Sequence, residues 1–175
     1  MTSAAVYSAA HRGLYATSRI GETDLATDDI PSFLEIIAAR HKAIADCPVT
    51  IVTGDGWSGH MITVPPPPGA DLAHGLWIKT FDDVVMVGLD HAHFHTRWPP
   101  EMRDVAPPWL DATMIVDSIL TEQVMAVSGW IGDELRCDTF CFSGWEFELT
   151  TPNLNRVRYR SWLGTFDRDE ALPGD

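Results

Sequence analysis

The stretch Asp83–Thr96, with the sequence DVVMVGLDHAHFHT, predicts the longest strand of the chain. Val85, Val87 and Leu89 recur at every second position, which is the period of a strand with one buried face. The apolar run Leu76–Thr80 precedes it, and Phe81-Asp82 between the two runs predicts the turn of a hairpin. We therefore expect a fold built around antiparallel strands.

Further strand patterns lie on both sides of this hairpin. Upstream, Val49–Thr53 and His60–Val64 flank a glycine-rich turn and predict another hairpin. Downstream, Cys137–Phe142 predicts one more strand. The runs Trp145–Thr150 and Arg156–Leu163 follow it.

The last two runs alternate apolar and charged residues, which predicts a paired, half-buried hairpin. An antiparallel register sets Glu146 opposite Arg160 and Glu148 opposite Arg158. Such paired carboxylates are expected to be structural, because a neighbouring arginine lowers a carboxyl pKa and makes the group a poor general acid.

Two helices are expected. The first begins at Pro31, where Ser32 and Glu35 have capping-box spacing, and it ends near Asp46 because Pro48 disfavours helix before it. The second begins after the pair Pro107-Pro108. Apolar residues then recur on one face, at Ala112, Ile115, Val116, Ile119 and Leu120.

This order of elements predicts an α+β fold, with a mostly antiparallel sheet of about six or seven strands and two main helices packed on one face. We expect residues 1–29 to form an irregular arm and residues 30–165 a single domain. Residues 166–175 are expected to be a polar tail.

The composition of the 175 residues, with 45% hydrophobic and 21% charged, is typical of a globular chain. Twelve Lys and Arg against 25 Asp and Glu give a net charge of -13. This charge argues against a broad nucleic-acid interface, which needs clustered cations. It suits a basic protein partner, or simply solubility.

The cellular location is expected to be cytoplasmic. The sequence has no apolar run of membrane-spanning length and no secretory signal pattern at its start. We therefore expect Cys47, Cys137 and Cys141 to be reduced thiols, and their spacing does not predict a structural zinc site.

The candidate metal ligands are His91, His93 and His95, which share one face of the predicted strand. Imidazole pairs at this spacing chelate zinc, nickel, copper or iron. His60 and His74 could add ligands from neighbouring strands, with Asp90 as an orienting partner and Asp90 or Glu101 as a base. The same histidines also continue the apolar row of the strand, so they are equally interpreted as its partly buried end.

The candidate partner-binding residues lie on or near the second helix. Between Glu101 and Glu148 the chain has ten acidic and two basic residues. Carboxylates on one side of the helix would form a docking surface with nearby aromatic anchors. The proposed set is Asp111, Asp117, Glu122, Trp109 and Trp130. The alternative is an ordinary solvated helix face.

Several segments resemble small bacterial proteins that are found beside polymorphic toxins and proposed as immunity proteins. These segments are 84–95 followed by Trp98-Pro99, the helix with Ile115-Val116-Asp117, and the closing run RYRSWLGTFD at 158–167. The similarity covers the central and C-terminal parts. It implies a cytoplasmic α+β domain that blocks a toxin by surface complementarity, and it transfers no functional residue.

Three functions are therefore weighed. The first is a non-enzymatic binding protein, with no cofactor, whose acidic face occludes a basic partner such as a toxin. The second is a metal-dependent enzyme that uses the histidine strand. The third is a structural or self-assembling domain.

Overall fold

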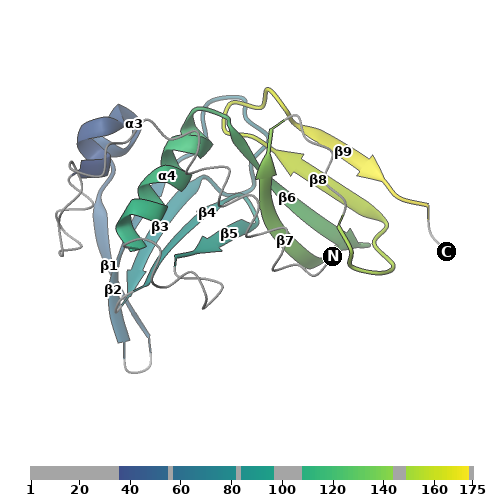
Figure 1. Cartoon of the computed structure of the whole chain (residues 1–175), viewed down its shortest axis with the longest axis horizontal. Helices are drawn as coiled ribbons and strands as arrows, with labels where there is room; N and C mark the ends of the chain where they lie inside the picture. Colours follow the sequence, from purple (N-terminus) through teal and green to yellow (C-terminus); the bar gives the residue numbers. More distant parts are fainter. Residues whose placement is uncertain (1–35, 55–56, 82–83, 97–107, 144–148, 174–175) are drawn as a thin grey trace.

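The structure is a computed structural model, and it describes residues 36–54, 57–81, 84–96, 108–143 and 149–173. Within these ranges the chain forms nine strands in two antiparallel sheets (Figure 1). Antiparallel pairing and the α+β class are in line with the sequence. The prediction of one sheet with six or seven strands is wrong.

The five-stranded sheet follows the order of the chain, so every connection joins neighbouring strands. Its members are β1 (Val49–Gly54), β2 (Trp57–Val64), β3 (Leu76–Phe81), β4 (Val84–Leu89) and β5 (Ala92–His95). The four-stranded sheet has the order β7-β6-β8-β9. Its members are β6 (Val124–Ile131), β7 (Glu134–Phe142), β8 (Arg156–Arg160) and β9 (Arg168–Ala171).

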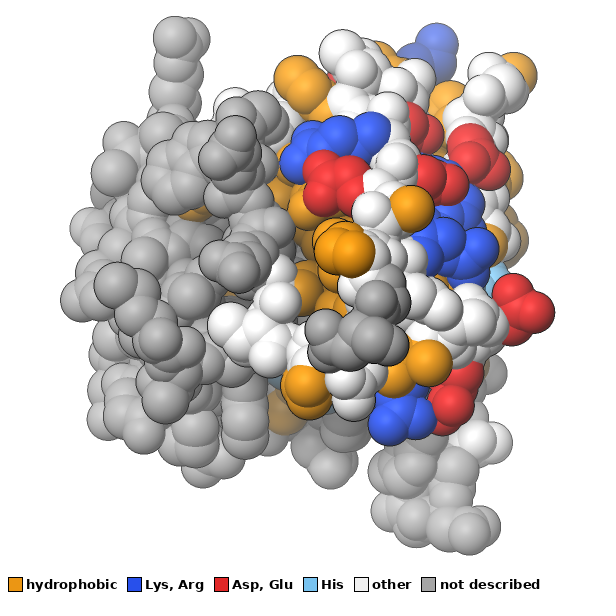
Figure 2. All heavy atoms as spheres, turned by 90° about the vertical axis from the view of Figure 1, so that its right-hand side faces the viewer, with side chains coloured by type: hydrophobic (Ala, Val, Ile, Leu, Met, Phe, Trp, Pro, Cys, Tyr) orange, Lys and Arg blue, Asp and Glu red, His pale blue; other side chains and the backbone are white. Residues whose placement is uncertain are grey.

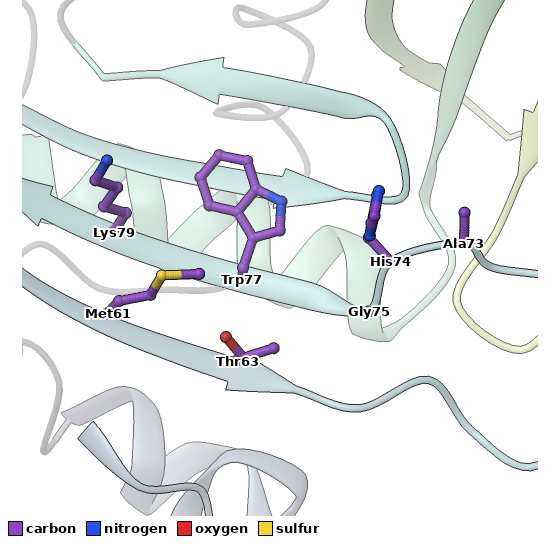
Figure 3. A pocket seen from close by; sticks show the side chains of 7 residues that line it. All are labelled: Met61, Thr63, Ala73, His74, Gly75, Trp77 and Lys79. Carbon is purple, nitrogen blue, oxygen red and sulfur yellow. The ribbon is translucent and has the colours of Figure 1, made fainter. Parts of the chain in front are cut away.

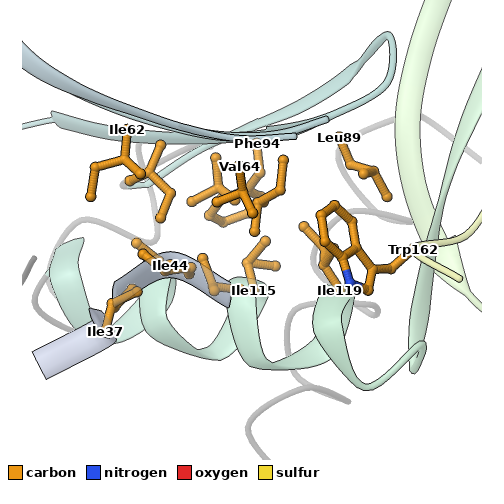
Figure 4. Close-up of a cluster of buried hydrophobic side chains, with 14 of the residues drawn as sticks. Ile37, Ile44, Ile62, Val64, Leu89, Phe94, Ile115, Ile119 and Trp162 are labelled. Carbon is orange, nitrogen blue, oxygen red and sulfur yellow. The ribbon is translucent and has the colours of Figure 1, made fainter. Parts of the chain in front are cut away.

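Helical segments cover one face of the five-stranded sheet (Figure 4), but the prediction of two main helices differs in detail, because the first is interrupted within the described residues. The second is α4 (Pro108–Leu120), and its predicted apolar stripe is buried. In the described part of the first, residues 36–40 are helical, His41 is extended, and α3 (Lys42–Ala45) follows. Ile37 and Ile44 bring this segment into the core. Residues 31–35 lie outside the described residues.

The main hydrophobic core fills the space between the helices and the sheet, and one end of the four-stranded sheet closes it (Figure 4). Burial of these apolar side chains is the main stabilising contribution, at about 25 cal/mol per Å² removed from water. The largest contributors include Ile37, Ile44, Ile62, Ile78, Val87, Leu89, Phe94, Ile119 and Trp162.

The predicted long strand Asp83–Thr96 is wrong, because the chain reverses at Asp90 and His91 to form the β4–β5 hairpin. Asp90 takes a positive φ of 52°, which Asp and Asn tolerate better than most residues. Its side chain is 3% exposed. The polar residue in the middle of the apolar pattern therefore marks a turn.

The strand β6 lies in a segment for which the sequence predicted no strand. Val124 and Ala126 face the main core, whereas Met125 and Val127 enter a second apolar cluster on the opposite face of the four-stranded sheet. A strand buried on both faces has a continuous apolar sequence without the alternation that identifies a half-buried strand.

The predicted pairing of Arg156–Leu163 with Trp145–Thr150 is also wrong, because β8 lies between β6 and β9. Glu146 and Glu148 are outside the described residues. The expected polar tail contributes β9 as an edge strand.

Arg160 ties β8 to the loop between β2 and β3. Its guanidinium is 3% exposed and lies 2.8 Å from Asp71 and 2.6 Å from Asp169. It also donates a hydrogen bond of 2.8 Å to the carbonyl of Tyr159. The buried guanidinium therefore joins two residues, Arg160 and Asp71, that are 89 positions apart in the sequence.

We predict that Arg160→Met lowers the free energy of unfolding by about 1–3 kcal/mol, because the buried guanidinium no longer joins β8 to Asp71 and Asp169. Arg136→Met is the matched control, since Arg136 pairs with Glu134 at the surface and such pairs contribute about 0–1 kcal/mol. Urea unfolding measures both. Equal losses in the two variants would contradict the role given to Arg160.

Candidate functional site

The β4–β5 reversal places His93 and His95 on the face of the five-stranded sheet that is opposite the helices. Ala92 and Phe94 are buried in the main core, and the histidines between them point the other way. In the register, His93 is opposite Gly88 and His95 is opposite Met86. We call this surface the outer face and define it by Met61, Thr63, Trp77, Lys79, Met86, Gly88, His93 and His95.

The side chain of Trp77 lies flat across the neighbouring strand (Figure 3). A Cβ atom added at Gly88 would be 2.0 Å from Cε2 of its indole, so only glycine permits this position. His93 lies on the next strand, opposite Gly88. The indole ring of Trp77 is roughly parallel to the imidazole ring of His93, with ring centres 6.5 Å apart and planes at 27°. The tryptophan is thereby held as a rigid platform in the middle of the outer face.

A hollow of about 510 Å³ opens beside Trp77 (Figure 3). Its floor comes from β2 and β3, and one wall comes from the loop that leads into β3. The lining carries a lysine and a histidine but no carboxylate, in a chain whose net charge is -13. The lining residues are Met61, Thr63, Ala73, His74, Gly75, Trp77 and Lys79.

The buried carboxylate of Asp90 fixes the wall of the hollow. Its Oδ1 accepts hydrogen bonds from the backbone N–H groups of Ala73, at 2.7 Å, and His74, at 3.4 Å. The backbone N–H of Asp90 donates in return to the carbonyl of His74, at 3.0 Å. The sequence predicted Asp90 to orient a metal ligand, whereas in the structure its carboxylate binds the backbone of a loop.

His93 connects the two sheets through Asp138 on β7. Nδ1 of His93 lies 3.0 Å from Oδ1 of Asp138, and the backbone N–H of His93 donates to the same oxygen at 3.2 Å. The hydrogen bond that His93 donates to Asp138 raises the pKa of His93, although partial burial lowers it. The same carboxylate therefore fixes both the strand and the ring.

His95 lies beside His93, with ring centres 5.0 Å apart and planes at 58°. Burial lowers the pKa of His95, and the neighbouring charge on His93 lowers it further. His95 is therefore neutral at pH 7, which is the form that binds metals.

The third predicted ligand, His91, lies in the turn and is packed elsewhere. Its ring makes edge-to-face contacts with His74, at 5.2 Å, and with Trp130, at 5.0 Å. Within the described ranges, no group of three or more His, Cys, Asp or Glu residues is arranged to hold a metal ion. The structure thus brings His93 and His95 together and places His91 with His74. His60 pairs in register with Thr80 on β3.

Two carboxylates of the predicted acidic face, Asp117 and Glu122, have partners inside the molecule. Asp117 contacts His41, and it lies 3.5 Å from Arg40. Glu122 accepts hydrogen bonds from the backbone N–H of Leu163, at 2.9 Å, and from the hydroxyl of Thr165, at 2.6 Å. Burial tends to raise the pKa of Glu122, but these hydrogen bonds lower it overall.

The aromatic residue Trp130 is half-buried rather than a protruding anchor. Its indole N–H donates to Ser128 at 2.9 Å, and the guanidinium of Arg156 lies 5.1 Å from the ring centre. Trp109 and Asp111 belong to α4, but their side chains lie outside the described residues, as does Glu101. On the side of the molecule in Figure 2, basic and acidic side chains lie next to one another.

Sequence reasoning missed the residues that shape the outer face, namely Trp77, Lys79, Met61 and Gly88. Trp77 and Lys79 alternate with the buried Leu76 and Ile78, so their shared face was readable. The contact of Trp77 with Gly88 could not be predicted from the sequence, because it depends on the register between two strands.

Comparison with known proteins finds no matching family model, curated protein or solved structure. Within the described part of the chain, no helix is long and apolar enough to cross a membrane.

We predict that Gly88→Ala displaces the Trp77 ring and lowers the free energy of unfolding by about 1–3 kcal/mol, the usual cost of overpacking. The loss should be smaller when Gly88→Ala is made in a Trp77→Ala background, because the clashing ring is gone. A double-mutant cycle by urea unfolding measures this coupling. Additive losses would show that the two residues do not interact.

For Asp90 we predict that Asp90→Ala lowers the free energy of unfolding by about 1–3 kcal/mol, since two backbone donors lose their acceptor. Asp90→Asn should lose less, because Asn tolerates the positive φ and keeps an acceptor oxygen. Proteolysis of the loop that contains Ala73 should be faster in Asp90→Ala. An equal response of the Asn and Ala variants would contradict this assignment.

Proposed function

We propose that this chain is a cytoplasmic binding protein of the immunity type and that it contacts a protein toxin through the outer face. The observation that carries the proposal is Trp77, a rigid aromatic residue held over Gly88 at the edge of a hollow of about 510 Å³. Residues that dominate binding energy are enriched in tryptophan and lie in pockets that exclude water.

The outer face suits a side chain of the partner better than a separate small molecule. The hollow is open and its lining is mainly apolar, with Met61 and Trp77 among the lining side chains (Figure 3). An apolar side chain that enters it would pack against both. Thr63 and Lys79 at the rim offer polar contacts.

The net charge of -13 supports a basic partner through long-range attraction. This role does not need individual carboxylates at the contact, so it is compatible with the internal partners of Asp117 and Glu122. We expect added salt to slow association more than it speeds dissociation.

The test is binding to a candidate basic toxin domain, and protection of cells against that domain. We predict that Trp77→Ala weakens binding at least about 30-fold, equivalent to about 2 kcal/mol, as expected of a dominant contact. Calorimetry measures the affinity, and growth of cells that express the toxin measures protection.

Leu163→Ala is the matched control, because Leu163 is also a large apolar residue and is 61% exposed in the turn after β8. It should bind as the unmodified protein does. If Leu163→Ala lost binding and Trp77→Ala kept it, the contact surface would lie on the four-stranded sheet and the proposal would fail.

A further inference from the structure

We propose that His93 and His95 together bind one divalent transition-metal ion, with Asp138 as the residue that orients His93. The proposal is independent of the protein partner. It rests on three features of the described residues: the spacing of the two rings, the carboxylate on His93, and the rigid surroundings of the pair.

The spacing of the rings matches a shared metal ion. Zinc binds imidazole nitrogen at about 2.0–2.1 Å with tetrahedral angles, which puts the centres of two ring ligands roughly 5 Å apart. The centres of His93 and His95 are 5.0 Å apart, and their planes are inclined at 58°. This separation is therefore compatible with one shared ion.

The contact with Asp138 has the form that supports a metal-binding histidine. Histidine ligands usually give their second ring nitrogen to a carboxylate, which fixes the tautomer and the ring orientation. Asp138 lies 3.0 Å from Nδ1 of His93, so Nε2 is the nitrogen that would take the metal. A metal ion would have to displace any group that is hydrogen-bonded to Nε2 of His93.

The surroundings hold the pair in place. His93 lies against the Trp77 ring on one side and is joined through its backbone to Asp138 on the other sheet. The strand that carries both residues is anchored by Phe94, which is buried between them.

Two imidazoles leave further coordination positions to water or to a donor from a bound molecule. The preference for nitrogen ligands points to zinc, copper or nickel rather than magnesium or calcium. His74 and His91 form the competing pair, with ring centres 5.2 Å apart. His91 is packed edge-on against Trp130, whereas His93 is joined to a carboxylate, so we favour His93 and His95.

The experiment uses the untagged full-length protein after treatment with a chelator and dialysis. Zinc chloride is added in a calorimetric titration, and copper(II) sulfate is added for electron paramagnetic resonance. We expect one equivalent of either metal to bind, with nitrogen hyperfine splitting in the copper spectrum.

The variants assign the ligands. His93→Ala and His95→Gln should each lose stoichiometric binding, and Asp138→Asn should weaken it about tenfold or more. His74→Ala is the matched control and should bind normally. Circular dichroism confirms folding of each variant.

Absence of stoichiometric binding in the unmodified protein would overturn the proposal. So would binding that survives in His95→Gln or disappears in His74→Ala. Because the titration uses metal alone, its failure leaves the toxin-binding assay unaffected, and failure of that assay leaves the metal result unaffected.

Discussion

The outer face depends on the reversal at Asp90 and His91. In β4 the odd-numbered residues Val85, Val87 and Leu89 face the core, and an uninterrupted strand would carry the histidines to that side. The reversal pairs Leu89 with Ala92, and residues paired across strands share a face. Even-numbered residues therefore become the buried ones in β5, and His93 and His95 move to the opposite surface. The carboxylate of Asp90, which accepts the N–H groups of the adjoining loop, connects this reversal with the wall of the hollow.

The second constraint is the burial of β6 on both faces. Val124 and Ala126 belong to the main core, while Met125 and Val127 belong to the second cluster, so this strand joins the two sheets into one packed structure. β7 then runs beside β6 and presents Asp138 to His93. A change in the packing of β6 would therefore move the carboxylate that orients His93.

The sequence predicts those parts of the fold that show a clear period. The stripe from Ala112 to Ile119 identified α4, and the early strands were found nearly within their observed limits. The sequence could not locate β6, whose continuous burial removes the alternation. Nor could it choose the partners of Arg160, because Asp71 is distant along the chain and the competing Glu146 fitted a local pattern equally well. The histidine motif was visible, but its division into His93 with His95 and His91 with His74 follows from one turn.

The net charge of the chain can attract a basic partner from a distance, whereas different residues stabilise the complex at the contact surface. A field from the net charge of -13 acts over about a Debye length, near 8 Å at physiological salt, whichever carboxylates produce it. Asp117 and Glu122 contribute to that field while they hold neighbouring segments in place. At the contact itself, desolvating a carboxylate is costly, whereas burying Met61 and Trp77 is favourable. A basic partner drawn in by the acidic chain can therefore gain most of its binding energy on an apolar and aromatic surface. The residues that determine the rate of association need not be those that determine the lifetime of the complex.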